Sequence, residues 1–180
     1  MKTFHELLTE LDACEEAIHW ARDMTIEQIV EQCPRGDWLL WLASKVKIDH
    51  RKLTLAKGHC ANTVRHLMKD ERSLNAVDTA IAYGEGKVAY EELAAASADA
   101  AAAYAAYADA DAYAGAAAAD AAYAAAYPSA YADAYAGAAA ADAAAYCANH
   151  AKNQNRKETA DICRKYIGQD IIDKVNELLK

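Results

Sequence analysis

Long apolar runs, paired cysteines and catalytic motifs are all missing from this chain. No stretch approaches the roughly 20 apolar residues that a helix needs to cross a bilayer. The N-terminal residues MKTFHELLTELDACEE carry charges where a signal peptide has an apolar core, so we expect a cytoplasmic protein without membrane contact. No C-x-x-C pair occurs, which argues against a disulfide framework and a zinc ribbon and predicts free thiols at Cys14, Cys33, Cys60, Cys147 and Cys163.

Basic residues are absent from the middle of the chain. No Lys or Arg lies between Lys87 and Lys152. The acidic residues of this stretch account for the net charge of -8, because the other 19 of the 27 acidic residues balance the 19 basic ones. An acidic surface repels phosphate backbones and anionic lipids, so direct nucleic-acid or membrane binding is disfavoured and a protein partner with a basic surface is favoured. The acids are Glu91, Glu92, Asp99, Asp109, Asp111, Asp120, Asp133 and Asp142.

No catalytic constellation can be assembled from the titratable residues. His59, Cys60 and His66 come nearest to a metal-ligand cluster, but metal sites on helices usually use i, i+3 or i, i+4 pairs with further ligands. Cys33 with His50 or His59 resembles a nucleophile and base, yet the chain contains no G-x-S-x-G elbow and no Gly-rich phosphate loop. We predict a protein that is not an enzyme and that has no metal site and no cofactor.

The first part of the chain, to about Tyr83, is typical of short capped helices. Each begins at a residue whose side chain can accept a hydrogen bond from the first turn, and each carries apolar residues at helical spacing. No segment alternates with the period of two that predicts a β-strand. The expected N-caps are Asp12, Thr25, Asp37, Asp49 and Ser73, and the last of these helices stops near Gly84 and Gly86.

The second part, from about Val88 to Tyr146, consists almost entirely of Ala, Tyr and Asp. Ala is the best helix former, so the low complexity predicts helix rather than disorder. The sequence DAYAGAAAADAA occurs at 111–122 and again at 133–144, and this offset of 22 residues is two 11-residue repeats, which place equivalent side chains along one stripe of a helix. Pro128 disfavours helix, so two long helices are expected to meet there, with one kinked helix as the alternative.

Glycines in the second half of the chain mark expected helix contacts or ends. Gly115 and Gly137 each cost about 1 kcal/mol relative to Ala inside a helix, so they indicate close helix contacts or further breaks. In the mixed tail, Gly168 is expected to end one helix and Asp170 to begin a final helix that docks on the core. The predicted fold is all-α: a bundle of short N-terminal helices (1–86) with long Ala-rich helices and a docking helix (87–180) packed against it in one compact domain.

The tyrosines and aspartates of the Ala-rich run have two interpretations, and each can hold for different residues. In the first, the tyrosines fill space between Ala faces and the aspartates keep the helices soluble. In the second, they form a contact surface, because Tyr supplies large rigid contact area at low entropic cost and pairs spaced i, i+4 lie side by side. The predicted partner-binding residues are Asp109, Tyr113, Asp120, Tyr123, Asp133, Tyr135, Asp142 and Tyr146.

The segment CPRGDWLLWLASKVKIDHRKLTLAKGHCANTVRHL, followed by the Ala-rich run, resembles the alanine-rich predicted immunity proteins of polymorphic toxin systems. This resemblance implies an inhibitor that holds a toxin or another effector protein, and it implies no catalytic residue. From the residues alone, the two tryptophans are interpreted as core, and Arg35 with Asp37 as fixing a turn. The most specific part of the resemblance is Cys33, Pro34, Arg35, Asp37, Trp38, Leu39, Leu40 and Trp41.

The sequence leaves three hypotheses for the function. The leading hypothesis is an immunity-type or phage counter-defence inhibitor that neutralises a toxin, nuclease or other effector by protein–protein contact through the acidic Tyr/Asp surface. The second is a sponge for a small nucleotide-like ligand, which requires Arg35, Arg51, Arg65 or Arg72 to line a pocket between helices. The third is ice binding or a structural role, which lacks the regular Thr face that helical antifreeze proteins use, since no Thr lies between Val88 and Glu158. The Ala-rich helices can pair within one chain or between two chains of a homodimer.

Overall fold

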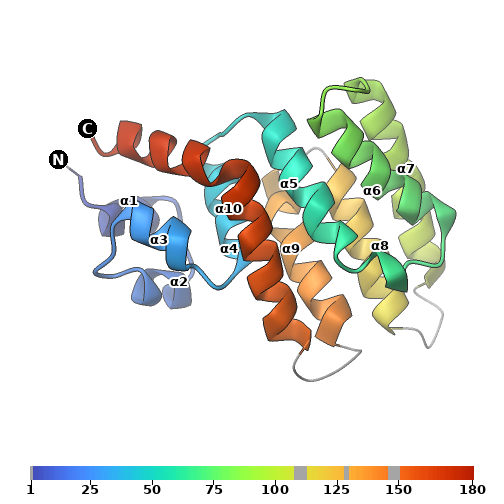
Figure 1. Cartoon of the computed structure of the whole chain (residues 1–180), viewed down its shortest axis with the longest axis horizontal. Helices are drawn as coiled ribbons and strands as arrows, with labels where there is room; N and C mark the ends of the chain where they lie inside the picture. The colour runs from blue at the N-terminus through green and yellow to red at the C-terminus, as the bar shows by residue number, and fades with distance from the viewer. Residues whose placement is uncertain (1, 108–112, 128–129, 146–150) are drawn as a thin grey trace.

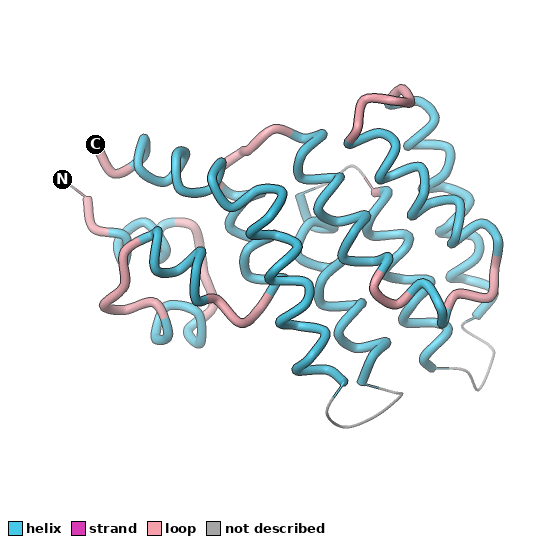
Figure 2. The backbone as a smooth tube through the Cα atoms, viewed as in Figure 1, coloured by secondary structure: helices cyan, strands magenta, loops and turns pink. Residues whose placement is uncertain are grey.

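The structure is a computed structural model of the whole chain, and it describes residues 2–107, 113–127, 130–145 and 151–180. Within these ranges, the side chains of 104–107, 113–119, 130–135 and 144–145 are not described. Ten α-helices and one 3₁₀ helix make up most of the described chain, which contains no strand, so the all-α prediction is confirmed (Figure 2). In these ranges, no helix has both the length and the apolar character that crossing a bilayer requires.

The helices follow one another in chain order with short connections. Their bounds are α1 (Phe4–Glu10), α2 (Glu15–Trp20), α3 (Ile26–Gln32), α4 (Gly36–Lys45), α5 (His50–Asn62), η1 (Arg65–Leu67), α6 (Glu71–Gly84), α7 (Tyr90–Tyr107), α8 (Tyr113–Ala126), α9 (Ala130–Ala145) and α10 (Ala151–Leu178).

The Ala-rich helix α9 lies in the interior of the bundle. It packs against α4, α5, α8 and α10, and α8 packs in turn against α5, α6 and α7 (Figure 1). The long Ala-rich helices therefore pack against the N-terminal helices as predicted. One hydrophobic cluster joins residues on both sides of residue 86, such as Val77 of α6 with Leu93 of α7 and Ala121 of α8.

Alanine forms the inner faces of α8 and α9. A methyl side chain lets neighbouring helices approach closely, because the distance between helix axes depends on the side chains at the contact. One close approach is at Gly137 of α9, where an added Cβ would lie 3.1 Å from the backbone nitrogen of Asp37 in α4. Gly137 thus marks a close helix contact, one of its two predicted roles. The alanines at most 5% exposed in these two helices are Ala121, Ala122, Ala124, Ala125, Ala126, Ala136, Ala139, Ala140, Ala141 and Ala143.

The Ala-rich run forms three helices rather than the expected two. The break at Pro128 is confirmed, because α8 ends at Ala126 and α9 begins at Ala130. A single helix from Val88 to Tyr127 is wrong, since α7 ends at Tyr107 and α8, which packs against it, begins at Tyr113. One helix over that span would be about 60 Å long. Two shorter helices can bury their Ala faces against each other, although no Pro or Gly between Tyr107 and Tyr113 indicates in the sequence that a helix ends there.

The expected helix end at Gly168 is wrong. Helix α10 runs from Ala151 to Leu178 without interruption, and Figure 1 shows it change direction along its length. Gly168 is buried inside α10, and an added Cβ would lie 3.1 Å from Cγ1 of Val30 in α3. The glycine serves a close approach of two helices, which its sequence context does not distinguish from a C-terminal cap.

Two of the predicted N-caps are confirmed. The Thr25 hydroxyl accepts a hydrogen bond from the Gln28 backbone N–H, and the Asp49 carboxylate accepts one from the Lys52 N–H. These caps satisfy backbone donors that have no partner within the helix.

Two further cap predictions are wrong because another residue nearby takes the position. Helix α2 begins after Cys14, and Asp12 instead has a φ of 61°, in the left-handed region. Helix α6 is capped by Asp70, while Ser73 lies buried within its first turn. Several acceptors lie near each helix start, and sequence alone does not show at which of them the backbone turns into the helix.

Candidate functional site

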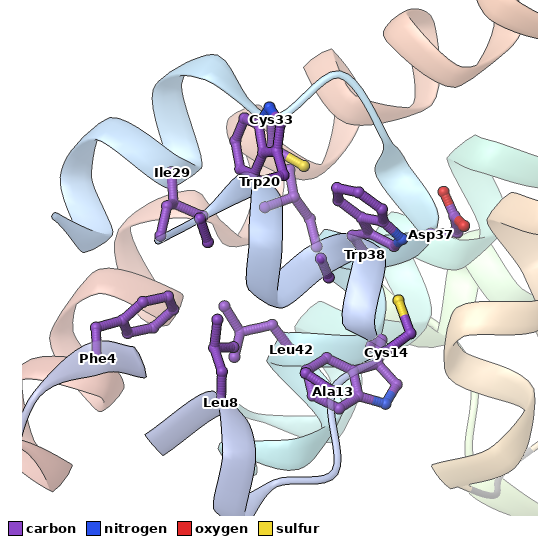
Figure 3. A pocket seen from close by; sticks show the side chains of 14 residues that line it. Phe4, Leu8, Ala13, Cys14, Trp20, Ile29, Cys33, Asp37, Trp38 and Leu42 are labelled. Carbon is purple, nitrogen blue, oxygen red and sulfur yellow. The ribbon is translucent and has the colours of Figure 1, made fainter. Parts of the chain in front are cut away.

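An apolar pocket lies among α1, α2, α3 and α4 (Figure 3). Its volume is about 140 Å³, and all three tryptophans of the chain, Trp20, Trp38 and Trp41, line it. A cavity of about 150 Å³ with apolar walls can hold a benzene ring. We call this site the tryptophan pocket. Its remaining lining is Phe4, Leu8, Ala13, Cys14, Ala17, Ala21, Ile29, Cys33, Asp37, Leu39 and Leu42.

The tryptophan pocket reaches the molecular surface. None of its three tryptophans is fully buried, and Cys14 at its edge is exposed. The rings of Trp20 and Trp38 lie 5.9 Å apart at an angle of 54°, so they meet tilted rather than stacked. Trp38 and Trp41 also pack on the hydrophobic core. Each tryptophan is therefore partly a core residue, as predicted, and partly a wall of the pocket.

Residues 33–42 build one wall of this pocket. Cys33 ends α3, is 1% exposed, and its thiol donates to the Arg35 carbonyl at 3.3 Å. Gly36 then begins α4 directly against α10, where an added Cβ would lie 2.5 Å from Thr159 Oγ1. Trp38 and Trp41 are three residues apart in α4 and so lie on one face of that helix. The turn therefore fixes both tryptophans relative to the core.

Arg35 connects the wall of the pocket to two carboxylates. Its guanidinium carbon lies 4.5 Å from the centre of the Trp38 ring, a cation–π contact. Its Nη2 and Nε donate to the Asp37 carboxylate at 2.5 and 3.2 Å, and its Nη1 donates to Glu16 at 3.1 Å. The hydrogen bond to Asp37 raises the pKa of Arg35 above its ordinary value. The N-cap prediction for Asp37 is wrong, because Arg35 occupies that position and Asp37 lies inside the first turn.

The buried thiol of Cys33 is protonated at neutral pH. Burial raises its pKa to about 11, which the hydrogen bond to the Arg35 backbone only partly offsets. The thiolate, rather than the thiol, is the nucleophile, and no histidine is among the residues that line the pocket. The chemistry of this lining therefore suits binding an apolar group.

A second hollow of about 500 Å³ shares Trp20 and Trp38 with the tryptophan pocket. It lies between α2, the turn before α4, and the beginning of α10. Arg35, Arg156 and Lys157 line it with one acidic residue, Glu16. Arg156 and Lys157 form no ion pair with any residue that the structure describes. We call this hollow the basic groove, and its other lining residues are His19, Pro34 and Asn153.

The predicted Tyr/Asp surface is described at three of its eight residues. Asp142 is exposed and pairs with Lys152 at 2.5 Å. Tyr123 is half-buried against the alanine cluster, its ring lies 5.0 Å from that of Tyr127, and burial raises its pKa. Asp120 is half-buried, and none of the three lines the tryptophan pocket or the basic groove. Asp109, Tyr146 and the side chains of Tyr113, Asp133 and Tyr135 lie outside the described part.

The histidine and cysteine candidates lie apart from this site. His59 stacks on Tyr166 with ring centres 4.5 Å apart, and burial lowers its pKa. In the described ranges, no group of three or more His, Cys, Asp or Glu side chains is arranged to hold a metal ion. The thiols of Cys60 and Cys163 are buried 4.0 Å apart in the core. Cys147 lies outside the described residues.

Comparisons of the chain with protein families, with curated proteins and with solved structures find no match. The function is therefore inferred from the chemistry of the site itself.

Sequence reasoning missed Trp20, Arg156 and Lys157. A signal for Trp20 was present, because every tryptophan of the chain falls within residues 20–41. No local signal identifies Arg156 or Lys157, which reach the basic groove only because α10 packs against α4.

Proposed function

We propose that this protein is a non-enzymatic binding protein of the immunity type, which neutralises an effector protein by direct contact centred on the tryptophan pocket. The observation that carries this proposal is an apolar pocket that opens to the surface and is lined by every tryptophan of the chain. Trp and Arg are enriched among the residues that dominate interface energies, and such residues cluster around pockets that receive an anchor side chain. The volume suits one phenyl ring or one branched aliphatic side chain.

The polar groups near the pocket support binding rather than catalysis. The Cys33 thiol is protonated, and the Asp37 carboxylate already accepts two hydrogen bonds from Arg35. Neither group is available to abstract a proton from a bound molecule. One wall of the pocket comes from the segment that resembles immunity proteins, through Cys33, Trp38 and Trp41, which favours the inhibitor hypothesis over other kinds of binding.

The acidic Tyr/Asp surface is a secondary contact in this proposal. Of its described residues, Asp142 is already paired with Lys152, and Tyr123 packs partly against the alanine core. A basic partner would have to displace Lys152 before it could pair with Asp142, which reduces the gain from that contact.

A second candidate function is a sponge for a small ligand, which the position of Arg35 in the basic groove supports. A pocket ligand would have to present an apolar group, because the walls offer almost no hydrogen-bonding partner for a polar edge. The polar edge of a nucleobase would lose its hydrogen bonds with water there, so a nucleotide fits this pocket poorly. An amphipathic anion fits it better.

Selection from a displayed random-peptide library on the immobilised protein tests the proposal. We expect enrichment of peptides that share one large apolar residue. The variant Ala17→Phe places a ring in the tryptophan pocket and should lose these peptides, whereas Ala94→Phe, the same change on α7, should retain them. Circular dichroism and thermal melting establish that both variants are folded. The proposal fails if no peptide is enriched, or if the enriched peptides bind Ala17→Phe as tightly as the original protein.

A further inference from the structure

The tryptophan pocket and the basic groove are adjacent, because Trp20 and Trp38 line both. When a side chain of a ligand fills the pocket, the atoms bonded to it lie close to the groove. A ligand that uses both hollows has an apolar group for the first and anionic groups for the second.

The charge of the groove is opposite to that of the protein as a whole. Arg35, Arg156 and Lys157 line it with one acid, Glu16, and Asp37 also pairs with Arg35, so one positive charge remains in excess in a chain whose net charge is -8. Charges act mainly within the Debye length of about 10 Å at 0.1 M salt, so a bound segment experiences this local excess of positive charge more than the distant acidic residues. Complementary charge beside an apolar anchor supplies specificity and orientation.

Glu16 already occupies one of the anion positions. It accepts a hydrogen bond from Arg35 Nη1 at 3.1 Å, and its side chain is 71% exposed. Exposed ion pairs are weak, so an incoming carboxylate can replace it on Arg35. Asp37 behaves differently, because it is 8% exposed and binds Arg35 through two hydrogen bonds. Asp37 thus holds the guanidinium over Trp38 while the position of Glu16 is exchangeable.

Glu16 also belongs to an element of the pocket wall. Glu16 lies on α2, the helix that supplies Ala17 and Trp20 to the pocket. In the described chain, its ion pair with Arg35 is the polar contact between α2 and the turn before α4. The anion position on Arg35 therefore lies beside the helix that forms part of the pocket wall.

We infer that the tryptophan pocket and the basic groove form one composite site for a peptide segment of the partner protein in which a large apolar side chain is flanked by acidic residues. The apolar side chain enters the pocket, and a flanking carboxylate takes the place of Glu16 on Arg35 while Arg156 and Lys157 bind the others. This inference rests on the proposed function. The net charge of the chain favours a partner with a basic surface, whereas this site favours acidic residues of the partner.

The three tryptophans provide the measurement. Each indole N–H gives a signal in a ¹H–¹⁵N correlation spectrum, and all three rings line the pocket, so shifts of these signals report directly on binding. The probes are end-blocked peptides Asp-Asp-Phe-Asp-Asp, Lys-Lys-Phe-Lys-Lys and Asp-Asp-Ala-Asp-Asp. We expect the acidic Phe peptide to bind at least about tenfold more tightly than either of the others, and added salt to weaken it.

Variants separate the parts of the site. The double variant Arg156→Ala with Lys157→Ala should weaken the acidic Phe peptide about tenfold and should not weaken the basic peptide, because the charges removed attract only the first. The control pair Lys69→Ala with Lys87→Ala removes the same charge outside the groove and should change neither. Glu16→Gln should tighten the acidic Phe peptide by a few fold, because the internal competitor for Arg35 is gone.

Three results would overturn the inference. They are equal binding of the acidic and basic Phe peptides, equal loss of both in the Arg156/Lys157 variant, and weaker binding in Glu16→Gln. If both Phe peptides bind equally and Ala17→Phe abolishes both, the composite site is wrong while the pocket remains a binding site. If neither Phe peptide shifts an indole signal and the library also yields nothing, the proposed function fails with it.

Discussion

Replacement of Gly36 by alanine tests the close approach of α4 to α10. The added Cβ would lie 2.5 Å from Thr159 Oγ1 and 2.6 Å from the backbone carbonyl carbon of Thr159. Non-bonded carbon atoms attract best at about 3.5–4.0 Å, so one helix has to move by about 1 Å. Rotating the Thr159 side chain relieves the first contact but leaves the second, because the second is with the backbone.

The expected loss follows from this crowding. Overpacking of a well-packed core costs about 1–3 kcal/mol. Alanine is a better helix former than glycine by about 1 kcal/mol in a helix interior, but Gly36 is the first residue of α4, where this gain is smaller. For a chain of this length, each kcal/mol lowers the melting temperature by about 2–4 °C. We therefore expect Gly36→Ala to melt roughly 2–12 °C lower, as these per-kcal values imply.

Urea unfolding followed by tryptophan emission measures this loss. The slope of unfolding free energy against urea should be unchanged while the midpoint falls, since native packing is altered and the surface exposed on unfolding is not. Ser44→Ala in the same helix is the control and should stay within about 0.5 kcal/mol of the original protein. A Gly36→Ala variant as stable as the original would refute the backbone contact between α4 and α10, and with it the account of how the turn positions the tryptophans.

Three further predictions concern buried groups. Lys57 is fully buried and donates to the carbonyl oxygen of Tyr127, the residue after α8, at 3.0 Å. Lys57→Ala should therefore lower the free energy of unfolding in urea by about 2–5 kcal/mol, whereas Lys52→Ala on the exposed side of the same helix should lower it by under about 1 kcal/mol. Burial lowers the pKa of His59, so the unfolded chain takes up its proton first as the pH falls below about 6.5, and stability decreases in that range. Between pH 7.5 and 5.5, the free energy of unfolding of His59→Gln should fall less than that of the original protein. An equal fall in both proteins would show that His59 does not cause the decrease. Iodoacetamide at pH 8 should label Cys14 much faster than Cys33, which is 1% exposed with a pKa of about 11, and equal labelling in peptide mass spectra would show that Cys33 is accessible.

Helical content was predictable from the sequence because it depends on local chemistry. Alanine favours helix wherever it packs, and the Thr25 and Asp49 caps satisfy donors within their own first turns. The break at Pro128 is local in the same sense. The end of α7 at Tyr107 was not predictable, because the packing of α8 against α7 depends on the burial of Ala faces and the sequence has no Pro or Gly there.

The candidate site was only partly predictable, for a related reason. Residues 33–41 could be identified as a distinctive segment, and their tryptophans as large apolar side chains that pack. That these rings border a pocket depends on α2, and that a cationic groove adjoins it depends on α10, more than 110 residues further along the chain. Contacts between such distant segments leave no periodic pattern, so Arg156 and Lys157 look like ordinary solvated residues in the sequence.

The alanine interior also has a consequence for how the helices find their alignment. Identical methyl groups repeated along α8 and α9 would pack almost equally well after a slide of one turn, so the methyl faces by themselves do not define a unique register. The few other groups at these helices break the degeneracy. Gly137 lies against the backbone of α4, Lys57 donates to the carbonyl oxygen of Tyr127, the residue that follows α8, and Asp142 pairs with Lys152. Sliding either helix would break these contacts, so Gly137 and a few polar side chains select one alignment.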